Sequence, residues 1–86
     1  MSMTLNDDVL ADLEAPTRAD DPDAERWRRA QLLLAAIDGD RERLFELQSL
    51  FILRLHRASD DFGASEGLRV VESAIAMIIA EAALKA

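Results

Sequence analysis

The chain contains no cysteine, and this absence removes two kinds of stabilising site at once. Without a thiol group the chain forms neither a disulfide bond nor a thiolate metal site. A domain of 86 residues buries only about 60 to 65% of the surface that its unfolded chain exposes. We therefore expect self-association to supply part of its stability.

Long hydrophobic runs are also lacking. The longest stretches without a charged residue are eight residues long, Ala30–Ile37 and Ser73–Ala80, whereas a membrane-spanning helix needs about 20 apolar residues. The N-terminal segment becomes acidic at Asp7 and Asp8, unlike the basic start of a signal peptide. These features predict no membrane contact and a cytoplasmic location.

An excess of positive charge is also lacking, because the net charge is -7. The negative excess lies in the first 25 residues, where eight acidic side chains accompany one arginine, while residues 26–86 carry nine acidic and nine basic side chains. Contact with phosphate groups needs a clustered positive field, so direct binding to nucleic acid is not expected. We expect the acidic segment to meet a basic or apolar surface of a protein partner.

Apolar residues recur at helical spacing in four segments, which predicts an all-α fold. The first helix is expected from Thr4 to Leu13, and the second from Asp21 to about Asp38, followed by Gly39. The third and fourth are expected over 41–58 and 66–84. Residues 1–20 are predicted to form an acidic segment with one short amphipathic helix, and residues 21–86 a small bundle domain.

The third and fourth segments are predicted to form a central antiparallel hairpin. Both carry more large apolar side chains than one narrow stripe requires, so each needs cover on more than one side. We expect a homodimer to provide this cover, with interface residues Phe51, Leu53, Val70, Met77 and Leu84. In the alternative, the first two helices cover both faces within one chain.

Two polar residues fall on apolar helix faces and are predicted to be buried. Gln48 lies among leucines and phenylalanines, and its amide needs partners because an unpaired buried polar group costs about 1 to 3 kcal/mol. We interpret Gln48 as a residue that fixes the register of the packed helices. Glu72 is predicted to form a salt bridge with Arg54 across the hairpin.

The sequence favours a protein-interaction or regulatory module, and no catalytic, cofactor-binding or metal-binding residue is expected. The predicted contacts to a partner are Leu5, Asp8, Val9, Asp12, Leu13 and Trp27. A first alternative is a small dimeric enzyme with an anion site between helices, built from Arg28, Arg54, Gln48 and Glu72. A second is a self-assembling structural component of a phage or a compartment. The arginines are otherwise expected to pair with nearby acidic residues.

Overall fold

The computed structural model describes residues 13–15 and 20–85, which form three helices and no strand. The helices are α2 (Pro22–Ala36), α3 (Arg41–Arg57) and α4 (Phe62–Lys85). The prediction of an all-α fold is thus confirmed. Most of the predicted first helix lies outside the described residues, and so do four of the predicted partner contacts, Leu5, Asp8, Val9 and Asp12.

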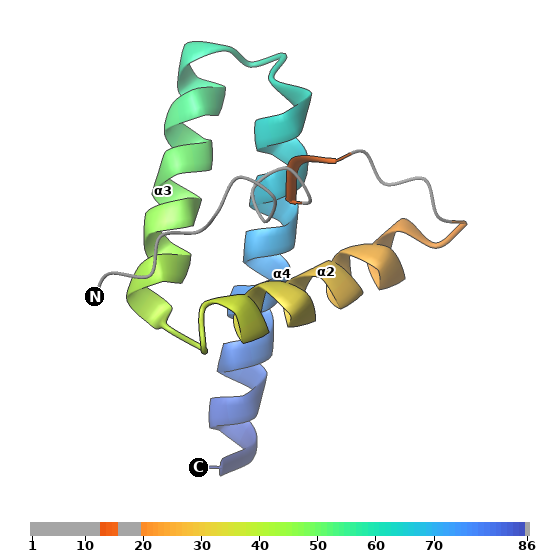
Figure 1. The fold of residues 1–86 in the computed structure, drawn as a ribbon, viewed down its shortest axis with the longest axis vertical. Helices are drawn as coiled ribbons and strands as arrows, with labels where there is room; N and C mark the ends of the chain where they lie inside the picture. The colour runs from red at the N-terminus through yellow and green to blue at the C-terminus, as the bar shows by residue number, and fades with distance from the viewer. Residues whose placement is uncertain (1–12, 16–19, 86) are drawn as a thin grey trace.

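Helix α4 is the central element of the arrangement. Helices α3 and α4 run antiparallel and side by side, and α2 crosses α4 (Figure 1). Within the described ranges α4 packs against both other helices, whereas α2 and α3 do not pack against each other. The predicted hairpin is therefore present, and α2 covers only its α4 side.

Acidic side chains begin the first two of these helices, as predicted. The Asp21 carboxylate accepts a hydrogen bond from the Ala24 N–H at 3.1 Å, and the Asp40 carboxylate accepts one from the Glu42 N–H at 3.0 Å. Such caps satisfy N–H groups that have no partner in the first turn of a helix. Between the two helices Gly39 has a φ of 68°, a left-handed conformation that glycine adopts without strain.

Helix α4 begins at Phe62, four residues earlier than predicted. The capping residue is Asp61, whose carboxylate accepts a hydrogen bond from the Ala64 N–H at 3.0 Å. Ser65, directly before the predicted start at residue 66, lies inside the helix. Asp61 takes this role because Arg54 of α3 holds the same carboxylate through two hydrogen bonds of 3.1 and 3.2 Å.

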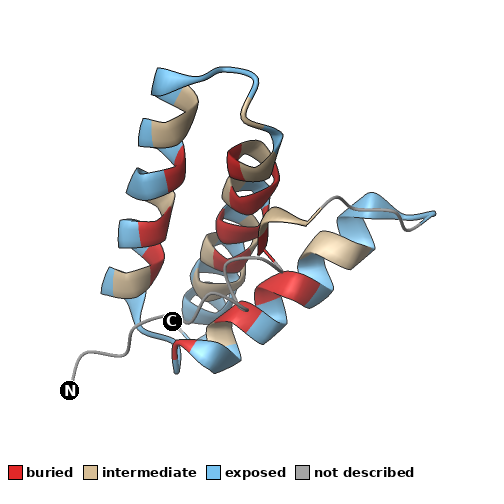
Figure 2. Cartoon of the chain, turned by 45° about the horizontal axis from the view of Figure 1, so that its top comes forward, coloured by how far each residue is buried: buried red, intermediate tan, exposed pale blue. Residues whose placement is uncertain are grey.

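The core lies where α2 and α3 meet α4, and buried residues follow the inner sides of all three helices (Figure 2). Phe51 and Val70 are both fully buried there. Their prediction as residues of an interface between two chains is therefore wrong. Val70 is covered within one chain because α2 and α3 flank α4, as in the alternative in which a single chain covers both faces.

One close approach holds α3 against α4. Phe51 packs over Gly67, where a methyl group would lie only 2.6 to 2.9 Å from three ring atoms of Phe51. No side chain fits in that space unless the buried ring moves. Gly67 therefore allows the two helices to approach closely.

We predict that Gly67→Ala lowers the free energy of unfolding, as measured by urea denaturation. Helix propensity favours alanine by about 1 kcal/mol, but overpacking a buried site costs about 1 to 3 kcal/mol, and the Phe51 ring is fully enclosed. The control is Phe51→Leu, in which the same Gly67→Ala change should cost less. An increase in stability from Gly67→Ala alone would contradict the packing described.

Candidate interaction surface

A buried carboxylate joins α2 to α4. Glu66 is only 9% exposed, and Arg26 Nε and Nη2 donate hydrogen bonds to its carboxylate at 3.2 Å each. Arg29 Nη1 lies 3.9 Å from the same group and donates to the Ala15 carbonyl at 2.7 Å. The ion pair thus fixes α2 on α4 and connects both to the segment at residues 13–15.

A second cluster closes the end of the hairpin. Besides Asp61, Arg54 binds Glu14, with 2.6 Å between Nη1 and Oε1. The hydrogen bond to Glu14 and the neighbouring Asp61 raise the pKa of Arg54 above its ordinary value. The Ala64 N–H and then Arg54 lower the pKa of Asp61 below its ordinary value of 3.8. This cluster holds residue 14 of the acidic segment against α3.

The predicted pair of Arg54 and Glu72 is wrong, and so is the predicted burial of Glu72. Glu72 is exposed, whereas Gln48 is half-buried. The contact of Phe51 with Gly67 sets the register of the hairpin, and it places Glu72 beyond Phe51, toward Gln48. Arg54 lies near the closed end of the hairpin and binds acidic residues there.

The four residues proposed for an enzyme site do not converge. Arg28 binds Glu25 on α2, Arg54 lies at the closed end of the hairpin, and Glu72 faces solvent. Other arginines also pair with acidic neighbours, as expected, for example Arg43 with Glu46 at 3.2 Å. The described part of the chain contains no group of three or more His, Asp or Glu side chains that could hold a metal ion.

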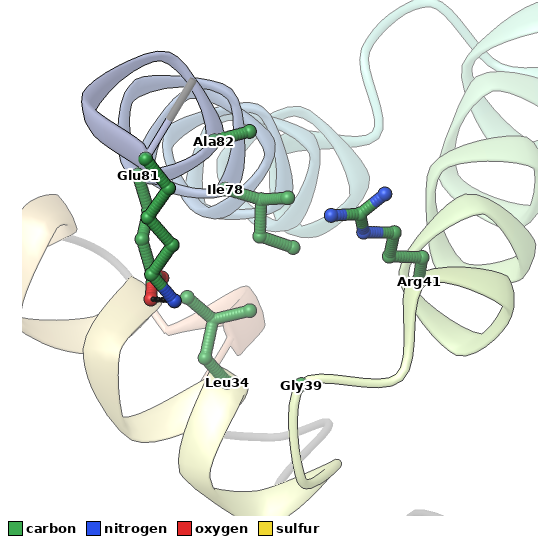
Figure 3. A pocket seen from close by; sticks show the side chains of 7 residues that line it. Leu34, Gly39, Arg41, Ile78, Glu81 and Ala82 are labelled. Atoms are coloured by element: carbon green, nitrogen blue, oxygen red, sulfur yellow. Dashed lines mark hydrogen bonds and ion pairs between the residues drawn. The ribbon is translucent and has the colours of Figure 1, made fainter.

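Two hollows on the surface contain carboxylates that already bind basic side chains. The larger, about 480 Å³, lies beside the pair of Arg26 and Glu66. The second, about 270 Å³, lies between the end of α2 and the end of α4. Figure 3 shows Arg41 on one side of it and Glu81 on the other, and Glu81 binds Lys85 at 2.9 Å. Neither hollow gathers the unpaired groups that a catalytic site needs.

A third hollow, about 170 Å³, is apolar and lies between α3 and α4. Its lining residues are Arg41, Leu44 and Phe45 of α3 and Ile75, Ile78 and Ile79 of α4. Phe45 is 53% exposed, Ile52 is 50% exposed and Ile79 is 63% exposed. Within the described residues only α4 packs against α3, so the cover expected on a second side of α3 stays a prediction.

We call the surface around this hollow the hairpin face. It consists of one row on each helix: Phe45, Gln48, Ile52 and Leu55 on α3, and Leu68, Glu72, Ile75 and Ile79 on α4. Glu66 marks the side of α4 that faces α2, because Arg26 of α2 binds it. At about 100° per residue, the opposite side of α4, roughly half a turn away, carries Leu68, Ile75 and Ile79. The hairpin face is thus on the side of α4 away from α2.

The other predicted surface residues are scattered. Leu13 is buried in the core, which corrects its prediction as a partner contact, whereas Trp27 on α2 is 45% exposed. Of the predicted dimer contacts, Met77 is half-buried against the core. Leu53 and Leu84 are exposed, on another flank of α3 and near the end of α4.

The sequence-based prediction missed the rows of the hairpin face, although their spacing is visible in the sequence. Phe45, Ile52 and Leu55 were counted among many apolar residues of one helix. At about 100° per residue, Phe45 and Ile52 lie about 80 to 120° around α3 from the buried Leu44 and Phe51, and Leu55 lies between these two groups and packs against the core.

Comparison of the chain with known protein families, with curated proteins and with solved structures gives no match. No described helix combines the length and apolar character needed to cross a membrane.

We predict that Glu66→Gln lowers the free energy of unfolding by about 3 kcal/mol, because it breaks the buried ion pair that joins α2 to α4. Arg26 and Arg29 then keep their pairs with Asp23 and Glu25 on α2. Urea denaturation measures this loss. The matched control is Glu81→Gln, which breaks the exposed pair with Lys85 and should have almost no effect. Equal effects of the two changes would show that Glu66 does not hold α2 on α4.

We also predict that Asp61→Asn reduces the loss of stability in acid. The folded-state pKa of Asp61 is lowered, so its contribution is fully present above the pKa of the unfolded chain and disappears as the pH falls through the lower folded value. The difference in unfolding free energy between wild type and Asp61→Asn should therefore shrink below about pH 4. Asp60→Asn, at an exposed neighbouring carboxyl, is the control, and a difference independent of pH would refute the assignment.

Proposed function

We propose that this protein is a small helical protein-interaction module and that the hairpin face is its binding surface. The observation that carries this proposal is the exposure of Phe45, Ile52 and Ile79, each at least half exposed, on one side of two packed helices. Soluble monomers rarely expose a large contiguous apolar patch, and such patches commonly bind other proteins.

The arrangement of charges supports the same proposal. Arg26, Arg29 and Arg54 bind carboxylates of the same chain, so these side chains are engaged in holding the fold together. Among the eight residues that define the hairpin face Glu72 is charged, and Arg41 lines the hollow at one end of it. A surface of this kind favours a partner with an apolar side of its own.

The acidic segment has a smaller role in this proposal than the sequence suggested. Its described end contributes Leu13 to the core and Glu14 to the cluster around Arg54, so these two residues serve the fold. Residues 5–12 stay a proposed second contact to a protein partner. Trp27 on α2 is exposed enough to take part.

The enzyme alternative receives no support from the geometry. Arg28, Arg54, Gln48 and Glu72 lie on three helices and do not share one hollow. A catalytic constellation requires reacting groups within hydrogen-bond reach of one another and of a common substrate position.

The proposal is tested by using the full chain as bait in a lysate of the source cells and identifying captured proteins by mass spectrometry. The variant Phe45→Glu/Ile52→Glu places two charges on the hairpin face and should abolish capture. Leu32→Glu alters a side chain on α2 that is equally exposed, and it should capture the same proteins as wild type. Circular dichroism confirms that each bait is folded. Unchanged capture by the folded hairpin-face variant would refute the proposal.

A further inference from the structure

We infer that the partner of the hairpin face is a second copy of this chain and that two hairpins pack face to face around a two-fold axis parallel to α3 and α4. The inference rests on the proposed function and names the partner of the same surface. Its evidence is the spacing of the two rows, their relative heights and the distribution of charge.

Each row has the spacing of a helix that packs against another helix. Positions 45, 48, 52 and 55 of α3 are separated by three or four residues, and so are positions 68, 72, 75 and 79 of α4. This is the repeat of the a and d positions of a coiled coil. The side of α3 that packs on α4 has its own row, Leu44, Leu47 and Phe51. In the other row Phe45 and Ile52 are exposed, whereas Gln48 and Leu55 are half-buried. The two exposed side chains leave room for a second packing partner.

The two polar residues of the hairpin face lie at similar heights, within about 3 Å when counted from the contact of Phe51 with Gly67. Phe45 and Ile75 line one hollow, Gln48 lies three residues beyond Phe45, and Glu72 lies three residues before Ile75. Because α3 and α4 are antiparallel, both steps lead in the same direction along the hairpin. Gln48 and Glu72 thus form one polar layer between apolar layers on either side.

A two-fold rotation about an axis along the hairpin lays α3 of one copy on α4 of the other at equal heights. Gln48 of each copy then faces Glu72 of the other, and the amide N–H group donates a hydrogen bond to the carboxylate. Phe45 meets Ile75 and Ile79 of the second copy, and Ile52 meets its Leu68. An interface around a two-fold axis requires such self-complementary rows, whereas an entirely apolar partner would leave both polar groups unpaired.

Charge and size are compatible with this pairing. Residues 26–86 are neutral as a set, and the acidic start of α2 lies on the opposite side of α4 from the hairpin face. The 17 residues of α3 extend about 25 Å, and two adjacent helices are about 20 Å wide. The resulting footprint of about 500 Å² is of the same order as the ~800 Å² that each partner buries in a stable complex.

The natural absence of cysteine makes the pairing directly testable. Chains carrying Gln48→Cys are refolded together with chains carrying Glu72→Cys and then oxidised. A disulfide-linked dimer is expected from the mixture and not from either variant alone. In the matched control, chains carrying Ser49→Cys take the place of chains carrying Gln48→Cys. Position 49 lies at nearly the same height as position 48 but about 100° around α3. This mixture should give no linked dimer.

Sedimentation equilibrium provides the second measurement, at protein concentrations up to about 100 μM. The full chain is expected at twice its monomer mass of 9.5 kDa, and Phe45→Glu should weaken association by about 30-fold or more. A monomeric wild type whose lysate capture still requires the hairpin face would overturn this inference and leave the proposed function standing. Linkage in the Ser49→Cys mixture, or in Gln48→Cys alone, would overturn the two-fold arrangement.

Discussion

The close contact between Phe51 and Gly67 is the constraint on which the rest of the structure depends. Within the described residues α4 is the only element that packs against α3, so this contact determines both the distance and the register of the hairpin. The register in turn decides which residues share a surface. The register separates Glu72 from Arg54 and brings Glu72 close to the height of Gln48. It also places Phe45 and Ile75 at one hollow.

The charged residues divide the molecule into two sides with different properties. On the α2 side, Glu66 and Arg54 bind groups that are distant in sequence and draw α2 and residues 13–15 onto the hairpin. Buried ion pairs of this kind give specific geometry more readily than net stability. The other side of α4 has no such network and consists mostly of apolar side chains. One side of α4 is therefore committed to the fold, and the other is open to association.

The sequence predicted local features well and distant relations poorly. The boundaries of α2 and α3 followed from Asp21, Gly39 and Asp40, because caps act within a few residues. The start of α4 was missed because Asp61 is held by Arg54, a contact between two helices. Periodicity also showed that Val70 lies on an apolar face, but it could not show whether α2 or a second chain covers that face.

The two helix pairs differ in how far apart along the sequence their contacting residues lie. This difference affects the order in which the pairs form during folding. Helices α3 and α4 are joined by only four residues, 58–61, whereas the contact of Arg26 with Glu66 links positions 40 residues apart. Contacts between residues close in sequence form at lower entropic cost and earlier than distant ones. The hairpin is thus expected to assemble first and to offer its surface for association before α2 docks.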